Sequence, residues 1–157
     1  ENGTLTPVSL GTATVSAVYG NCKLTAKVKV IYGDGWHKIN SLWYYYKNEN
    51  PITGWVKDSG KWYYMDENGV MVRNLQTIDG KLYNFGTTGA MVTGWRIIDG
   101  SWYFFNDNGS MAKGWRLVNN VWYFMDESTG VMVTGSKTIN GKAYEFASSG
   151  ACTNPNI

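Results

Sequence analysis

The sequence predicts an all-β fold, a solenoid of about six stacked β-hairpin repeats preceded by a short N-terminal β segment. Three observations predict it. Gly-Trp pairs recur along the chain, a Trp-Tyr pair recurs at a constant distance after them, and two-residue turn sequences lie between the two. Since a single hairpin cannot bury both of its faces, neighbouring hairpins must stack.

Length and charge narrow the possible partners. The chain has 157 residues and a formal net charge of +2, with 14 Lys and Arg scattered along it. We therefore expect no nucleic-acid partner and no polybasic membrane surface. No run approaches the roughly 18 apolar residues of a membrane helix, so no membrane insertion is expected. Because the chain starts at Glu1 instead of an initiator Met, we interpret it as a fragment of a longer precursor.

Residues 1–32 differ in character from the rest of the chain. Alternation of β-branched or apolar with polar residues over 2–7, 10–17 and 23–30 predicts strands. This segment resembles the C-terminal strands of a bacterial immunoglobulin-like domain of secreted surface proteins, which implies a truncated remnant. Residues 33–157 then form the repeat domain. Uncovered strand edges invite pairing, so a homodimer through this segment is one expectation.

Six repeat units follow, each with two marker positions seven residues apart and a Tyr directly after the second marker. The first markers are Trp36, Trp55, Leu75, Trp95, Trp115 and Ser136. The second markers are Trp43, Trp62, Leu82, Trp102, Trp122 and Ala143. The Tyr residues are Tyr44, Tyr63, Tyr83, Tyr103, Tyr123 and Tyr144. Losses of Trp are paired within a unit while the Tyr is kept.

Turn chemistry between the markers predicts that each unit is a hairpin. Asp-Gly, Asn-Gly and Asn-Asn tolerate the positive φ of two-residue hairpin turns. The turn pairs are Asn40-Ser41, Ser59-Gly60, Asp79-Gly80, Asp99-Gly100, Asn119-Asn120 and Asn140-Gly141. After each hairpin a polar, Gly-containing loop is expected. Four of these loops are followed by Met71, Met91, Met111 or Met132, flexible side chains suited to filling the gap between hairpins.

Strand alternation assigns the aromatic residues to faces. A turn at Asp99-Gly100 pairs Ile97 with Trp102, which puts Trp95 and Trp102 on one face and Tyr103 on the other. In a head-to-tail stack, the Trp-Trp face of one unit meets the Tyr face of the next and encloses a cleft with three aromatic walls. A unit can then lose its own cleft and still close the one before it, which explains the paired losses.

The repeated motif resembles that of a known family. Thr53-Gly54-Trp55, residues 60–65 (Gly-Lys-Trp-Tyr-Tyr-Met) and residues 68–71 (Asn-Gly-Val-Met) closely resemble the choline-binding or cell-wall-binding repeat, over about residues 35–150. The resemblance implies a superhelical solenoid that binds choline or phosphocholine of teichoic and lipoteichoic acids. It also implies a secreted, extracellular, cell-wall-associated protein in which the module anchors a surface protein or wall hydrolase.

Carried over residue by residue, the resemblance gives four candidate clefts. They are Trp36, Trp43 and Tyr63; Trp55, Trp62 and Tyr83; Trp95, Trp102 and Tyr123; and Trp115, Trp122 and Tyr144. Further candidate ligand-binding residues are Met71, Met111 and Met132. The cleft at Leu75 and Leu82 should be empty. A cation-π contact is worth about 0.5–2 kcal/mol, so attachment would depend on several weak sites acting together.

Other interpretations are weaker. His37 is the only histidine and the carboxylates fall mainly in turns, so we expect no catalytic set, no metal and no cofactor, although a hydrolase domain could lie upstream. Cys22 and Cys152 are interpreted as unpaired thiols, and His37 as a solvated residue at a loop edge. Carbohydrate binding is the nearest alternative function, and a structural spacer is another. Tyr64, Phe85, Phe104, Phe105, Phe124 and Phe146 are interpreted as core.

Overall fold

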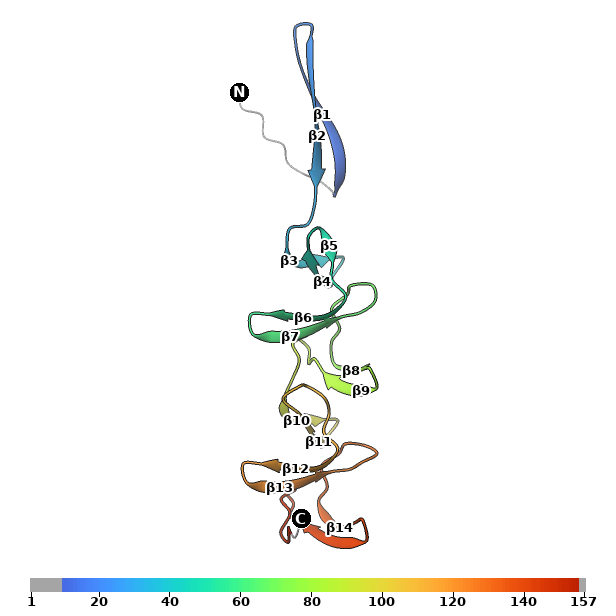
Figure 1. Cartoon of the computed structure of the whole chain (residues 1–157), viewed down its shortest axis with the longest axis vertical. Coiled ribbons are helices and arrows are strands. Elements are labelled where there is room, and N and C mark those ends of the chain that lie inside the picture. The colour runs from blue at the N-terminus through green and yellow to red at the C-terminus, as the bar shows by residue number, and fades with distance from the viewer. Residues whose placement is uncertain (1–9, 156–157) are drawn as a thin grey trace. The chain divides into compact units, whose positions relative to one another are not determined.

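The computed structural model describes residues 10–155, which form fifteen strands and no helix (Figure 1). The chain divides into two units, Glu1–Val56 with Met65–Met71, and Lys57–Tyr64 with Val72–Ile157. Successive strands pair in small antiparallel sheets, so the prediction of an all-β fold made of hairpins is confirmed. Over the described range, no helix has the length and apolar character to cross a membrane.

The first unit opens with a long hairpin of β1 (Gly11–Tyr19) and β2 (Cys22–Val30). Alternation gives it one face of Ala, Val, Leu and Cys side chains and an opposite face rich in Lys and Thr. Both faces are largely exposed. The strands expected over 10–17 and 23–30 are confirmed, whereas the one expected over 2–7 lies outside the described residues.

The first repeat has one strand more than expected. Its sheet joins β3 (Gly35–Ile39), β4 (Leu42–Lys47) and the short β5 (Asn50–Pro51). The predicted turn Asn40-Ser41 joins β3 and β4, with φ of 48° and 68°. A second tight turn at Asn48-Glu49, with φ of 50° and 66°, replaces the expected loop and returns the chain to the sheet. Two consecutive residues at positive φ form this kind of hairpin turn.

Each remaining repeat is a two-stranded sheet. The pairs are β6 (Gly54–Asp58) with β7 (Lys61–Met65), β8 (Leu75–Ile78) with β9 (Lys81–Asn84), β10 (Gly94–Ile98) with β11 (Ser101–Phe105), β12 (Gly114–Val118) with β13 (Val121–Met125), and β14 (Gly135–Ile139) with β15 (Lys142–Phe146). The turn prediction holds here too, because Asp99 has φ of 49° and the β10–β11 register pairs Ile98 with Ser101. The faces assigned from the sequence are therefore confirmed for this hairpin.

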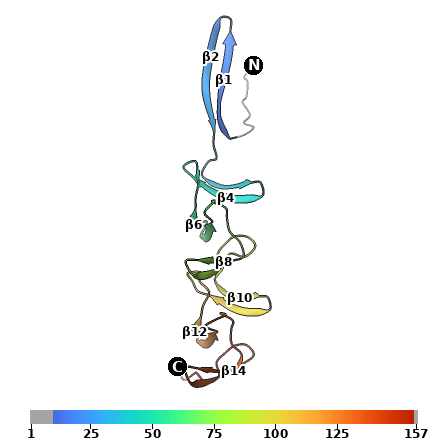
Figure 2. The same cartoon turned by 90° about the vertical axis from the view of Figure 1, so that its right-hand side faces the viewer.

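Within the second unit, the hairpins from β8 to β15 lie one after another and point in different directions (Figures 1 and 2). Backbone hydrogen bonds join the loop after each hairpin to the preceding hairpin. The Met111 N–H donates to the Leu82 carbonyl at 2.7 Å, and the Met132 N–H donates to the Trp102 carbonyl at 2.8 Å. These bonds hold each loop in a fixed place relative to the earlier hairpin.

Methionine side chains fill the space between successive loops, as predicted. Each lies on a glycine in the next loop: Met91 on Gly109, Met111 on Gly130 and Met132 on Gly150. The approach is so close that a Cβ atom on Gly130 would lie 2.6 Å from Met111 Cε. Flexible thioether side chains suit such irregular gaps.

Phenylalanine residues occupy the interior of the second unit. The fully or nearly fully buried ones are Phe85, Phe105, Phe124 and Phe146, which confirms their interpretation as core. Tyr64 and Phe104 are only half-buried. The Phe104 ring packs on Trp95 with ring centroids 5.1 Å apart, on the same face of the hairpin.

Candidate functional site

Two indoles on one hairpin face form the base of each aromatic site. On β10 and β11, alternation places Trp95 and Trp102 on the same face, with ring centroids 6.1 Å apart and ring planes at 87°. Trp115 and Trp122 on the next hairpin repeat this geometry at 6.2 Å and 89°. The edge-to-face arrangement stabilises each pair.

The third aromatic wall comes from the following hairpin. Tyr123 on β13 packs against Trp95 with ring centroids 4.8 Å apart and planes at 69°. In the next cleft, Tyr144 on β15 stands in the same relation to Trp115, at 4.8 Å and 68°. The structure therefore brings together the two predicted triads of the second unit, Trp95-Trp102-Tyr123 and Trp115-Trp122-Tyr144.

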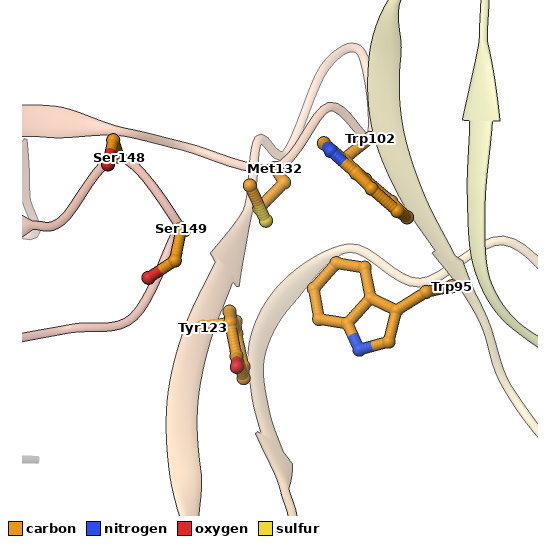
Figure 3. Close-up of a pocket in the computed structure, with 6 residues that line it drawn as sticks. All are labelled: Trp95, Trp102, Tyr123, Met132, Ser148 and Ser149. Carbon is orange, nitrogen blue, oxygen red and sulfur yellow. The ribbon is translucent and has the colours of Figure 1, made fainter.

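The Trp95 cleft is an open pocket of about 320 Å³ (Figure 3). Its lining consists of Trp95, Trp102, Tyr123, Met132, Ser148 and Ser149. No lining residue carries a charge, so the walls offer π faces and a thioether in place of an ion pair. Such walls suit a cation that has no N–H donor, because a quaternary ammonium gains from the negative face of an aromatic ring.

Met132 is held at this pocket by two contacts. Its N–H donates to the carbonyl of Trp102, and its side chain lies on Gly150 of the next loop. The same loop supplies Ser148 and Ser149, which are not among the site residues predicted from the sequence. Their polar loop is visible in the sequence, but its hairpin is the second one after the Trp95 and Trp102 hairpin. No pattern within a single repeat indicates contact over that distance.

The last cleft is more closely packed. Tyr144 is 7% exposed and belongs to a buried cluster with Phe124 and Phe146, on which Trp115 and Trp122 pack. Cys152 occupies the position equivalent to Met132, because its N–H donates to the Trp122 carbonyl at 2.8 Å. Its thiol is free, as is that of the exposed Cys22. A smaller side chain thus replaces the thioether in this cleft.

The first unit contains part of the first predicted cleft. Trp36 and Trp43 lie 6.3 Å apart at 84°, and the Met71 N–H donates to the Trp43 carbonyl at 2.8 Å. This matches the arrangement of Met132 with the Trp102 carbonyl. Two predicted assignments combine residues of both units and remain predictions. They are the role of Tyr63 in the first cleft and the second cleft of Trp55, Trp62 and Tyr83.

The methionines do not all border aromatic clefts. Met111 bonds to Leu82, so it lies at the leucine cleft and not at one of the four predicted aromatic clefts. Met91, which the predicted site did not include, donates its N–H to the Trp62 carbonyl at 2.7 Å. The spacing of methionines in the sequence is nearly constant, so only the hydrogen bonds between repeats reveal which hairpin each one faces.

His37 lies in a strand and has packing partners, and not at a loop edge as the sequence-based interpretation placed it. It lies in β3, half-buried, with ring centroids 4.7 Å from Tyr32 and 5.4 Å from Tyr46, and Nε2 is hydrogen-bonded to the Gly33 carbonyl at 2.7 Å. Tyrosines from the segment before the repeat and from β4 enclose the imidazole. The expectation failed because Tyr32 lies outside the repeat motif.

Two stretches of the chain match family models. Residues 92–135 match the choline-binding repeat, and residues 53–71 match a cell wall binding repeat. No curated protein matches the chain.

Many solved structures are similar to it, among them the following three. One is choline binding protein F from Streptococcus pneumoniae, with 30% sequence identity and a TM-score of 0.54, covering 87% of this chain and 58% of that one. Another is the multimodular pneumococcal cell wall endolysin from phage Cp-1 complexed with choline, with 27% identity, a TM-score of 0.52 and coverage of 83% and 42%. The third is the modular Cpl-1 endolysin complexed with a peptidoglycan analogue, with 29% identity, a TM-score of 0.51 and coverage of 78% and 38%. The chain therefore spans between 38% and 58% of the lengths of these proteins.

Proposed function

We propose that this chain is a non-catalytic module that binds choline groups of the bacterial cell wall, because residues 92–135 match the choline-binding repeat and residues 53–71 match a cell wall binding repeat. The observation that carries the proposal is the Trp95 pocket, in which three aromatic side chains and a thioether converge around about 320 Å³. Its lining offers no charged group, so it selects a cation through π faces.

Affinity at one cleft is modest, and retention comes from several clefts. A cation-π contact contributes about 0.5–2 kcal/mol, which makes each three-walled site weak by itself. A wall polymer presents many choline groups, so a second site engages at high effective concentration once the first is occupied. The repetition of the Trp pair in three hairpins, at 6.1–6.3 Å in each, supports this multivalent arrangement.

The finer assignments belong to the same proposal. The ligand is choline or phosphocholine of teichoic or lipoteichoic acids, and the chain is secreted and associated with the cell wall. Similarity to an endolysin, of which this chain spans 42%, supports a role in targeting a wall hydrolase domain located elsewhere in the polypeptide. The chain itself supplies no catalysis, which is supported by the packing of its single histidine, His37, between Tyr32 and Tyr46.

The N-terminal segment is a separate module in this proposal. Residues 1–32 belong to a bacterial immunoglobulin-like domain, and residues 33–157 form the choline-binding repeats. The long β1–β2 hairpin supports this division, because one of its faces is apolar and exposed. Strands of a β-sandwich normally cover such a face with a second sheet.

Titration with choline, followed by intrinsic Trp fluorescence, tests the proposal. We expect a saturable change with choline and none with glucose oligomers, since the indoles form the walls of the sites. A response to glucose oligomers alone would support the carbohydrate-binding alternative. No response to either ligand would indicate a structural spacer and contradict the proposal.

A further inference from the structure

Two serines form the polar side of the Trp95 pocket. Ser148 and Ser149 lie in the loop after β15, opposite the two indoles and beyond Tyr123 and Met132 (Figure 3). Both are exposed, and neither hydroxyl has a hydrogen-bond partner among residues 10–155. A hydroxyl that is already exposed and unpaired can bond to a ligand without breaking a bond within the protein.

The loop that carries the serines is held in place. The Ala147 N–H donates to the Ala151 carbonyl at 2.9 Å, and the Gly150 N–H donates to the Ala147 carbonyl at 2.8 Å. Gly150 is buried against the Met132 side chain, so the loop and the thioether wall form one packed unit. Backbone bonds and packing therefore hold the loop at the pocket, and rotation about each serine Cα–Cβ bond can turn the hydroxyl toward a bound ligand.

The chemistry of the two sides is complementary to an amphiphilic cation. A trimethylammonium group suits the aromatic side, which has no charged residue. Choline carries an oxygen two carbons from its nitrogen, and in a phosphate ester that oxygen bears further acceptors. Hydroxyls beside the cage can donate to these oxygens, whereas tetramethylammonium offers them nothing.

We propose that Ser148 and Ser149 recognise the oxygen-bearing end of the ligand and make the Trp95 cleft selective for choline and its phosphate esters over quaternary ammonium ions without oxygen. This inference rests on the proposed function, because it requires the cation to occupy the aromatic side. It adds a specificity contact from a third repeat to a cleft otherwise built from two.

The same arrangement does not recur at the last cleft. The loop beside the Trp95 cleft follows the second hairpin after the one that carries Trp95 and Trp102. For Trp115 and Trp122, no loop at the equivalent position exists within residues 10–155. Within residues 10–155 the serine contact therefore applies to the Trp95 cleft, although the aromatic walls of the two clefts have matching geometry.

The test uses the full chain with ¹³C-methyl methionine. The Met132 methyl reports on the Trp95 cleft, while Met71 and Met91, whose N–H groups bond to the carbonyls of Trp43 and Trp62, report on the sites at those two residues. Choline, phosphocholine and tetramethylammonium are titrated into the wild type, the double variant Ser148→Ala with Ser149→Ala, and the hydroxyl-retaining variant Ser148→Thr with Ser149→Thr. The Met132 signal is assigned with Met132→Leu.

The Met132 signal should show that the alanine variant binds choline and phosphocholine about threefold to tenfold more weakly than the wild type, which is the range for one or two lost hydrogen bonds. Its affinity for tetramethylammonium should be unchanged. The threonine variant should retain most of the affinity, and Met71 and Met91 should respond as in the wild type. An unchanged choline affinity, or an equal loss for tetramethylammonium, would overturn the inference while leaving choline binding intact. No response of any methionine to any ligand would instead overturn the proposed function.

Discussion

The side chain of Met132 lies directly on Gly150, so closely that a Cβ atom on that glycine would be 2.6 Å from Met132 Cε. This relationship joins two successive loops and completes one wall of the Trp95 pocket. The same relationship holds for Met111 and Gly130. A single contact thus serves both the stacking of repeats and the shape of the candidate binding site.

The Gly150→Ala variant tests that contact. Gly150 has φ of 81°, which costs an alanine ~1–2 kcal/mol, and the new methyl group would displace Met132 at a further cost of ~1–3 kcal/mol. Urea unfolding measures the sum. Gly141→Ala is the matched control, since its φ is 79° and nothing lies within 4 Å of the added methyl. Equal destabilisation of the two variants would show that the Met132 contact contributes nothing.

Replacing Trp102 with alanine should remove one choline site and leave the array folded. Trp102 is 42% exposed, so its truncation costs little packing, whereas Phe105 on the opposite face is fully buried. Phe105→Ala is the control and should cost ~3–5 kcal/mol of stability. Calorimetric stoichiometry and thermal unfolding give the two readouts. Global unfolding of Trp102→Ala would show that the indole belongs to the core.

The leucine cleft should be convertible into a binding site. The β8–β9 register places Leu75 and Leu82 on one face, and the Leu82 carbonyl already accepts the Met111 N–H as Trp102 accepts that of Met132. The double change Leu75→Trp and Leu82→Trp should therefore add one site to the calorimetric stoichiometry. Two leucines offer no π face to compensate a desolvated cation. Choline bound between Leu82 and Tyr103 in a crystal of the wild type would contradict the three-wall model.

Lowering the pH should remove the contribution of the Asp126 carboxylate to the stability of the folded chain. Hydrogen bonds from Lys137, Ser128 and the Thr129 N–H hold the pKa of this carboxyl well below its ordinary value of 3.8. Because the pKa is lowered by folding, the stabilisation is complete above pH 3.8 and declines as pH falls toward the folded-state pKa. Asp126→Asn should be less stable than the wild type at pH 7.

The difference in unfolding free energy between the wild type and Asp126→Asn should become smaller below pH 3.8. Urea unfolding of both proteins from pH 7 to pH 2 measures it. Lys137→Met removes the ammonium group whose Nζ lies 2.8 Å from Asp126 Oδ2. This variant should also be less stable than the wild type at pH 7. A difference between wild type and Asp126→Asn that stays constant from pH 7 to pH 2 would contradict the linkage.

The β1–β2 hairpin should mediate self-association. Tyr19 is 92% exposed and Leu24 75%, and both lie on the apolar face of the hairpin. Exposed apolar faces and open strand edges favour pairing with another copy. Sedimentation velocity should show concentration-dependent association that deletion of residues 1–31 abolishes. Identical sedimentation of the full chain and the deletion variant would contradict this prediction.

Local sequence predicts much of this protein. Turn pairs such as Asp99-Gly100 favour two-residue hairpin turns, and with the turn in place the two-residue period of a strand settles the register and faces. For that reason the pairing of Ile97 with Trp102, and the shared face of Trp95 and Trp102, could be derived before the structure was known. The extra strand β5 was missed because the turn Asn48-Glu49 lies after the second marker position, where the other repeats have a connecting loop and not a hairpin turn.

Contacts between repeats were decided only by the tertiary structure. The sequence by itself determined the hairpins, their faces and the candidate aromatic triads, because each depends on residues within one or two neighbouring units. It did not determine that Met111 faces Leu82, that Ser148 and Ser149 border a pocket two hairpins earlier, or that His37 lies between Tyr32 and Tyr46. The physical reason is that these positions depend on the rotation and rise between stacked hairpins, which no local periodicity sets. Side-chain packing such as that of Met132 on Gly150, together with the backbone hydrogen bonds between repeats, sets them instead.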